Sequence, residues 1–318
     1  RTGDAIDVFN DLNNQFDIKN IFAHEESGGA WTYKRDIRVH KWCKDVAVVF
    51  QESPRDGVVR RLKSRDLWSK ERDQRMGKAL IPAPVQIKYI FDDLGSFPEK
   101  NDPLFGDPVP GSVQKGGRKE AEKILSSFLN VRGAQYLFSI SKPESSTQHC
   151  SRLSPHLSYG TLSMREVVQA VHTARIEQPI KNGVSWKRVY SAFQSRLSWR
   201  CHFVQKIEDR PDIEFRCMHP AFENLRPKSV DEETFNSWKL GKTGYPLIDA
   251  VMRCLTQTGW ITFRMRALLV SFALHIQKFL LLIIYSKLDL CFLISFQVNH
   301  HYLILCILIF LFLKNLDY

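Results

Sequence analysis

The sequence predicts an α/β N-terminal part, with an incomplete parallel sheet, followed by an all-α part. Two observations support this fold class. Apolar β-branched runs alternate with a helical pattern at the start of the chain, whereas the periodic segments after the proline- and glycine-rich stretch have helical spacing. We therefore divide the chain into a partial α/β domain (1–85), a linker (86–115), a helical domain (116–275) and an apolar tail (276–318).

The N-terminal part has the order strand, helix, strand. Residues 17–26 alternate and then run apolar, as a buried strand does, and residues 46–52 form a short β-branched run. Residues 32–45 between them have helical spacing, and a further helical pattern covers residues 5–9. The short connections are typical of a βαβ unit in a parallel sheet.

The helical domain contains three strongly periodic segments. Residues 118–137 have helical spacing, and residues 163–177 open with Ser163 and Glu166 at the spacing of a capping box. The segment 185–208 places a set of apolar side chains on one helix face: Trp186, Val189, Tyr190, Phe193, Leu197, Val204 and Ile207.

Gly241-Lys242-Thr243 looks like the end of a phosphate-binding loop. Such a loop also needs a glycine five residues earlier and a preceding strand. That earlier position is Asn236, in a polar, helix-like segment, so we reject a nucleotide triphosphatase.

The same stretch is better interpreted as a turn followed by a helix. Gly241 and Gly244 allow the turn, and Pro246 suits the first helical position. We expect Gly259 to end this helix and Trp260 to start the next one.

Composition limits the class of partner. The formal net charge of +11 favours nucleic acid or another anionic partner. Seven cysteines, none in a C-x-x-C pair, argue against a zinc cluster and a secreted disulfide framework, and we predict no metal site. No targeting segment is visible, so we expect an intracellular location: nucleus, chloroplast or cytoplasm.

Residues 238–275 resemble the signature of the photolyase/cryptochrome family. The pattern W-x-x-G-x-T-G-Y-P-x-x-D-A-x-M-R-x-L-x-x-T-G-W is complete in them. Residues 151–163 resemble the flavin-diphosphate loop of that family, and residues 116–129 resemble the start of its FAD domain. The resemblance implies FAD as cofactor, DNA as partner and light-driven electron transfer from reduced FAD to damaged pyrimidines.

The resemblance also implies a set of FAD-binding residues: Tyr136, Ser151, Arg152, Leu153, Ser154, Arg200, Trp260 and Arg266. The four consecutive residues would bind the diphosphate, and free N–H groups at a helix start attract phosphate. Cys150 stands where many members of the family have threonine. A serine-capped helix start is the alternative interpretation of this loop.

A second set would face the DNA substrate: Arg196, Trp199, Phe263 and Arg264. Trp199 matches an aromatic that packs on a flipped pyrimidine dimer. However, Arg196 replaces a glutamate that binds the dimer, which exchanges an acceptor for a donor, and Phe263 replaces an asparagine. Core packing for Trp199 and a solvated helix face for the arginines are the alternatives.

Three functions stay open. The chain is a deoxyribodipyrimidine photolyase-type lyase, a blue-light photoreceptor or redox flavoprotein without repair, or an inactive truncated product. The third arises because the Asp-x-Asp and Asn cluster that holds the flavin ring in the family does not follow residue 275. The α/β part resembles the antenna domain of the family, but it does not identify an antenna chromophore.

The apolar tail has two interpretations. Residues 290–313 contain no Asp, Glu, Lys or Arg and are long enough to span a bilayer. Gln297, Asn299 and His300 lie in the middle of this stretch, where burial in lipid is costly. We therefore favour non-coding sequence read through at a splice junction over a membrane anchor.

Overall fold

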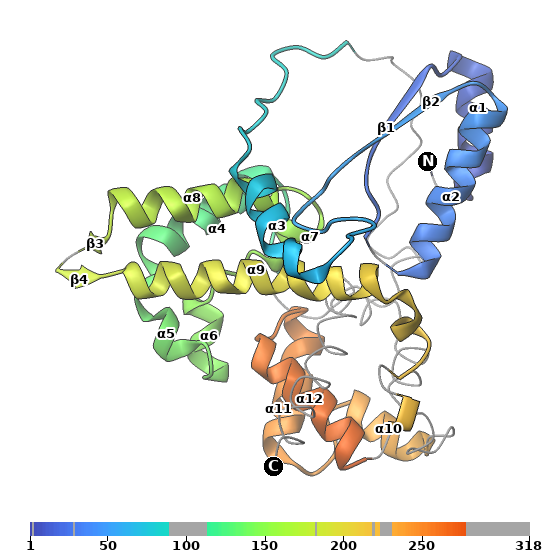
Figure 1. Cartoon of the computed structure of the whole chain (residues 1–318). Helices are drawn as coiled ribbons and strands as arrows, with labels where there is room; N and C mark the ends of the chain where they lie inside the picture. Colours follow the sequence, from blue (N-terminus) through green and yellow to red (C-terminus); the bar gives the residue numbers. More distant parts are fainter. Residues whose placement is uncertain are drawn as a thin grey trace.

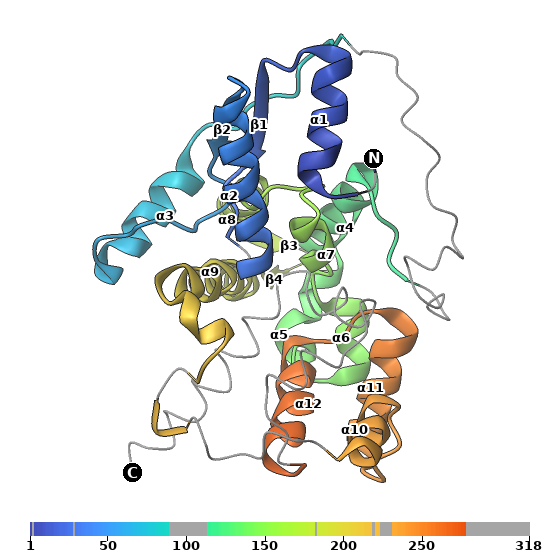
Figure 2. The same cartoon turned by 90° about the vertical axis from the view of Figure 1, so that its right-hand side faces the viewer.

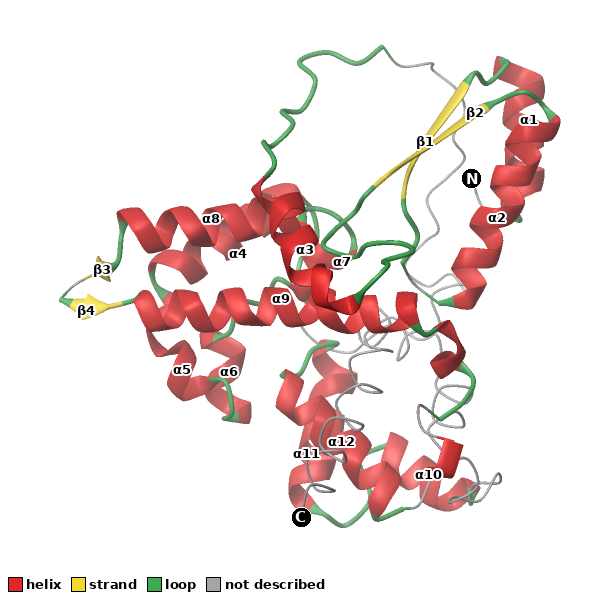
Figure 3. Ribbon diagram, viewed as in Figure 1, coloured by secondary structure: helices red, strands yellow, loops and turns green. Residues whose placement is uncertain are grey.

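The computed structural model describes residues 1, 3–27, 29–88, 113–181, 183–217, 220–222 and 231–277. Within them, a small α/β part precedes a helical body, which confirms the predicted fold class (Figures 1 and 3). The read-through and anchor interpretations of the tail, and most of the predicted linker, fall outside the described residues.

The α/β part is helix, strand, helix, strand, with these bounds: α1 Ala5–Phe16, β1 Asn20–His24, α2 Ala30–Asp45 and β2 Val49–Ser53. The two strands pair in parallel, as predicted, with Asn20 opposite Val49. Both helices pack on one face of the sheet around Trp42, which stacks on Phe9 at a ring-centroid distance of 5.5 Å. The other face exposes Phe22.

Residues 54–78 leave the sheet and pack into the helical body. They include η1 Arg65–Leu67 and α3 Trp68–Gly77, which the sequence analysis did not assign. Trp68 and Met76 are buried in the main helical core, and the indole Nε1 of Trp68 donates to the carbonyl of Gly57 at 2.9 Å. This segment therefore belongs, by packing, with the helices that follow it.

The main helical core is formed mostly by α4, α8 and α9. The bounds of its elements are α4 Arg118–Asn130, η3 Arg132–Gln135, α5 Tyr136–Ser139, α6 Pro143–His149, α7 Ser154–Ser158, α8 Met164–Glu177 and α9 Lys187–Asp209. The predicted capping box of α8 is present, and the predicted apolar face of α9 is buried.

One expectation for this region was wrong. The predicted helix over 118–137 ends at Asn130, and the chain turns closely at Gly133, where an added Cβ would lie 2.5 Å from the Phe128 carbonyl oxygen. A small antiparallel pair, β3 Ile180–Lys181 and β4 Val184–Ser185, connects α8 to α9 within the helical body.

A second core joins the three remaining helices, α10 Glu232–Lys239, α11 Pro246–Thr258 and α12 Phe263–His275. Two views show them grouped on one side of α9 (Figures 1 and 2). Gly259 ends α11 with φ +66°, as predicted. Trp260 does not start the next helix: α12 begins at Phe263, because the Thr262 hydroxyl caps it by accepting from the Met265 N–H.

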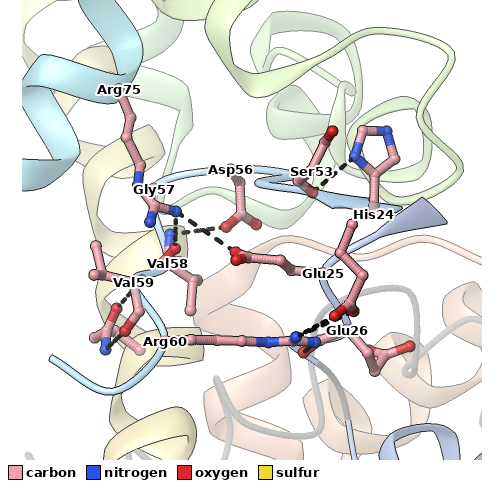
Figure 4. Close-up of polar contacts among 12 residues, drawn as sticks. His24, Glu25, Glu26, Ser53, Asp56, Gly57, Val58, Val59, Arg60 and Arg75 are labelled. Carbon is pink, nitrogen blue, oxygen red and sulfur yellow. Dashed lines mark hydrogen bonds and ion pairs between the residues drawn. The ribbon is translucent and has the colours of Figure 1, made fainter. Parts of the chain in front are cut away.

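The α/β part is held against the helical body near the carboxyl ends of its strands (Figure 4). The Arg60 guanidinium pairs with Glu52 at 3.0 Å, and Arg75 lies 3.7 Å from Glu25. The fully buried amide of Gln205 on α9 accepts from the Val59 N–H at 2.6 Å and donates to the Val59 carbonyl at 2.9 Å. The Gln205 side chain thereby pairs with both the N–H and the carbonyl of Val59.

The Gly-Lys-Thr stretch is a turn fixed by a carboxylate. Asp249, near the start of α11, accepts from the N–H and hydroxyl of Thr243 at 2.8 and 2.6 Å and from the Gly244 N–H at 3.0 Å. Gly241 has φ +63°, and a Cβ there would lie 2.8 Å from the Asp249 carbonyl oxygen. The pattern thus closes an αα connection, and the rejection of a phosphate-binding loop agrees with this geometry.

We predict that Asp249→Asn destabilises the chain by about 1–3 kcal/mol at neutral pH, because an amide cannot accept all three bonds. Burial raises the pKa of Asp249, but the hydrogen bonds from Thr243 and Gly244 outweigh burial and lower the pKa overall. A lowered folded pKa gives stability that is present above the unfolded pKa of about 3.9 and is lost as pH falls through the folded value.

Urea unfolding at a series of pH values measures both effects. The variant should be less stable at neutral pH and lose less stability below about pH 4 than the wild type does. Asp11→Asn, an exposed carboxylate on α1, controls for the loss of one negative charge. Equal acid sensitivity of Asp249→Asn and wild type would contradict the prediction.

Candidate functional site

A cavity of about 190 Å³ lies where the two helical cores meet. Its walls come from α9, from the loop and short helix around residues 150–157, and from the segment 260–266 that enters α12. All the site residues predicted from sequence line this one cavity: Tyr136, Ser151, Arg152, Leu153, Ser154, Arg196, Trp199, Arg200, Trp260, Phe263, Arg264 and Arg266. Segments more than a hundred residues apart in sequence thus meet as expected.

Arg132 holds the loop over residues 150–154 through hydrogen bonds to the loop backbone. Its guanidinium donates to the carbonyls of Cys150 at 2.6 Å and Ser151 at 3.3 Å. Arg152 has φ +61°, a left-handed conformation that a residue with a Cβ adopts at a cost. Pro155 lies in the first turn of the short helix α7. The loop is therefore ordered by backbone contacts, which leave its side chains to face the cavity.

Arg152 forms one wall together with Trp260. Its guanidinium carbon lies 4.1 Å from the centroid of the indole ring, and its Nε donates to Gln114 Oε1 at 3.2 Å. Gln114 in turn donates to the Arg152 carbonyl at 2.8 Å. Burial, followed by the nearby charge of Arg132, lowers the pKa of Arg152.

Arg266 is the most deeply buried charge of the site, with 4% of its surface exposed. Within the described part of the chain, its Nε has no hydrogen-bond partner. Burial, followed by the proximity of Arg152, lowers the pKa of Arg266 to about 9. A buried cation with no acidic partner among the described residues is costly, and an anionic group at this end of the cavity would offset that cost.

The aromatic wall comes from two different elements. Phe193 on α9 and Tyr136 on α5 are buried, and their ring centroids lie 6.2 Å apart. Burial, with the nearby Cys150, raises the pKa of the Tyr136 phenol above its ordinary value. Burial also raises the pKa of the Cys150 thiol to about 11, so this cysteine is a neutral wall residue near neutral pH.

The mouth of the cavity is aromatic and basic. Trp199 keeps 40% of its surface exposed, and the Arg196 guanidinium carbon lies 4.2 Å from its ring centroid. Phe263 meets the same indole edge-on at 6.4 Å, and Arg264 beside it is exposed. Core packing therefore does not explain Trp199, which is the most accessible aromatic of the lining.

Arg200 on α9 points toward the segment that follows β2. Its Nη1 donates to Asp56 Oδ2 at 3.0 Å, and only 14% of the arginine side chain is exposed. Arg200 was predicted from the sequence but its partner was not, because Asp56 lies 144 positions earlier. Phe203, Ile261 and Thr262 in the lining were also missed. The helical period of α9 would have indicated Phe203, four residues after Trp199.

All the charged side chains that the described residues bring to the cavity are basic. Among these residues the lining contains five arginines, Arg152, Arg196, Arg200, Arg264 and Arg266, and no aspartate or glutamate. The described residues hold no cluster of His, Cys, Asp or Glu with the geometry of a metal site, and none of their helices is long and apolar enough to cross a membrane. The cavity is therefore suited to an anionic ligand with flat aromatic surfaces.

Comparison with known proteins points in one direction. The profile described as the FAD binding domain of DNA photolyase matches residues 193–288, which include most of α9 and all of α10 to α12. The chain is similar to photolyases and cryptochromes over this domain. Relatives from both branches match it: the deoxyribodipyrimidine photo-lyase of Streptomyces griseus is 34% identical over 196 residues, and cryptochrome-1 of Arabidopsis thaliana is 32% identical over 158.

These matches cover part of each protein. The Streptomyces match spans 62% of this chain and 39% of the photo-lyase, and the Arabidopsis match spans 49% and 22%. The class III photolyase structure from Agrobacterium tumefaciens superposes with a TM-score of 0.69 over 96% of this chain and 63% of that one. At 18% identity, it supports the fold.

An archaeal photolyase structure from Sulfolobus tokodaii, described with two FAD molecules, matches with a TM-score of 0.61. It is 25% identical and covers 86% of this chain and 57% of that one. FAD is the cofactor of the matched domain. The buried, unpartnered Nε of Arg266 and the arginine-rich lining fit the diphosphate of such a ligand.

The volume limits what the described residues can enclose. Sites for small ligands have roughly 300–1,000 Å³, whereas this cavity has about 190 Å³. The described residues therefore enclose less space than a whole dinucleotide needs.

We predict that Arg266→Met stabilises the ligand-free chain by about 1–3 kcal/mol, because an apolar side chain of similar length removes an unpaired buried charge. The same change should abolish stabilisation by pyrophosphate or FAD. Thermal unfolding with and without each ligand measures both effects.

Arg264→Met is the matched control, since that arginine is exposed at the mouth. It should leave both the ligand-free stability and the pyrophosphate effect near those of the wild type. Retained stabilisation by pyrophosphate in Arg266→Met would show that the anion binds elsewhere.

Proposed function

We propose that this chain binds FAD in the arginine-rich cavity and serves light-driven electron transfer to a damaged pyrimidine in DNA. The observation that carries the proposal is the convergence of the twelve predicted residues on one cavity, whose lining, within the described part of the chain, is rich in arginine and lacks acidic groups. Because the chain spans about two fifths of its Streptomyces relative, this activity is a proposal and not an inherited property.

Different residues serve different parts of the cofactor. Arg152 and Arg266 would hold the diphosphate, with the backbone of residues 151–154 beside it. Trp260, Tyr136 and Phe193 offer the apolar surface that a flat ring needs. When bound, reduced FAD supplies the electron that light drives to the substrate, and the protein orients the ring and excludes water.

DNA would approach the mouth. The formal net charge of +11 favours contact with the phosphate backbone, and the exposed Arg264 lies beside the opening. The accessible indole of Trp199 offers a stacking surface to a base that has been flipped out of the duplex.

A blue-light receptor or redox role without repair is the second candidate. Arg196 over Trp199 gives the mouth only hydrogen-bond donors, and Phe263 beside it offers no polar atom. A thymine ring presents an N–H donor between two carbonyls, and neither side chain can accept from it. This composition of the mouth favours a role in which no thymine dimer is read.

The first test is the visible spectrum of the purified chain, followed by illumination with dimer-containing single-stranded DNA. Flavin absorbance together with light-dependent loss of dimers would support the repair function. Flavin absorbance with photoreduction but no loss of dimers would favour the second candidate. A chain that binds no flavin, even when FAD is added, would overturn the proposal.

We predict that Arg196→Glu increases the affinity for thymine-dimer DNA relative to undamaged DNA by roughly five- to tenfold. A correctly placed base contact is worth about 1–3 kcal/mol of discrimination, and a carboxylate can accept the thymine N–H. Arg196→Met is the matched control, because it removes the charge without placing an acceptor oxygen there. Equal discrimination in the two variants would mean that charge, and not hydrogen bonding, governs the mouth.

A further inference from the structure

Two consecutive residues that follow β2 reach two different walls of the cavity. The Arg55 guanidinium donates to the backbone carbonyl of Ser158, the last residue of α7. Asp56 Oδ2 accepts from Arg200 Nη1 at 3.0 Å on α9. The short segment that leaves the sheet therefore contacts both the helix behind the diphosphate loop and a cavity arginine.

The Asp56 carboxylate is held by a hydrogen bond within its own segment as well as by Arg200. It is 6% exposed, and its Oδ1 accepts from the Val58 N–H at 2.9 Å (Figure 4). Both carboxylate oxygens are thus used, one by a tight local turn and one by the arginine. A charge-assisted bond of this kind, shielded from water, restricts the direction of the guanidinium.

Arg55 lies close to the same pair. Burial, followed by the charge of Arg200, lowers its pKa, while Asp56 opposes that effect. The positive charges of Arg55 and Arg200 repel each other, and the negative charge of Asp56 offsets this repulsion. The three side chains therefore stabilise one arrangement of β2, α7 and α9.

We infer that Arg55 and Asp56 are positioning residues of the flavin cavity: Asp56 sets the direction of the Arg200 guanidinium, and Arg55 holds the end of α7. The inference deepens the proposed function and rests on it for the identity of the ligand. The segment that follows β2 contributes to cofactor binding through this dipeptide, although neither residue lines the cavity.

Two other contacts serve as controls because they avoid the cavity. Glu214 Oε2 accepts from the Ala30 N–H at 2.7 Å, and Arg165 donates to the Arg75 carbonyl at 3.0 Å. Neither Glu214 nor Arg165 lines the cavity. Glu214→Gln makes the same carboxylate-to-amide change as Asp56→Asn, and Arg165→Met removes an arginine–carbonyl contact like that of Arg55, in both cases away from the ligand.

The main experiment is titration of the purified chain with FAD, followed by flavin fluorescence. Asp56→Asn should raise the Kd about tenfold, since a mobile arginine has to be ordered on binding, whereas Glu214→Gln should change it less than about twofold. In an Arg200→Gln background, Asp56→Asn should have no further effect. An unchanged or lower Kd in Asp56→Asn, or an equal effect with and without Arg200, would overturn the inference.

A second measurement does not need bound FAD. Hydrogen exchange of the ligand-free chain should be at least about tenfold faster at residues 154–159 in Arg55→Met than in wild type, and unchanged there in Arg165→Met. Equal exchange in the two variants would overturn the role of Arg55. If the wild type binds no FAD, the proposed function fails, and exchange still decides whether this dipeptide holds the cavity wall.

Discussion

The long helix α9 faces the main core, the cavity and the segment around Val59. The rest of the structure depends on which of its residues face each of them. Its apolar face, with Tyr190 and Leu197, is buried in the main core. Phe193, Trp199 and Arg200 line the cavity. Near its end, Gln205 replaces water for both backbone groups of Val59. A register shift of one residue would place polar groups in the core and apolar groups against the α/β segment, so the helix admits one position.

The cavity brings several arginines close together, which lowers the stability of the ligand-free chain. Arginines from three separate segments converge on a small volume without an acidic side chain in the lining. Arg200 forms an ion pair with Asp56, which does not line the cavity, and the Arg152 guanidinium lies over the Trp260 ring. Arg266 is buried close to them. Such an arrangement lowers stability in the absence of a ligand and raises affinity for an anion. It is the balance expected of a site that is completed by its cofactor.

The sequence predicted the parts of the site that local pattern and family motif both mark. The loop around Arg152, the α9 face and the segment from Trp260 to Arg266 lie where expected. It could not predict the Asp56–Arg200 pair, since nothing in a single sequence relates positions 144 residues apart. It overextended the helix after residue 118, because the close approach at Gly133 depends on tertiary contact with Phe128 and Trp186. The helix that was expected to start at Trp260 begins at Phe263, because the Thr262 side chain caps it.

The packing of residues 54–78 has a consequence for how such chains can be recombined. The covalent boundary is the proline- and glycine-rich linker, but Trp68 and Met76, which precede it, are buried among the helices that follow it. An exchange of N-terminal parts between homologues at that linker would replace Trp68 and Met76 in this core with side chains shaped for another partner. The modular unit of this fold therefore ends at Ser53, and a crossover there would keep the helical body and its cavity intact.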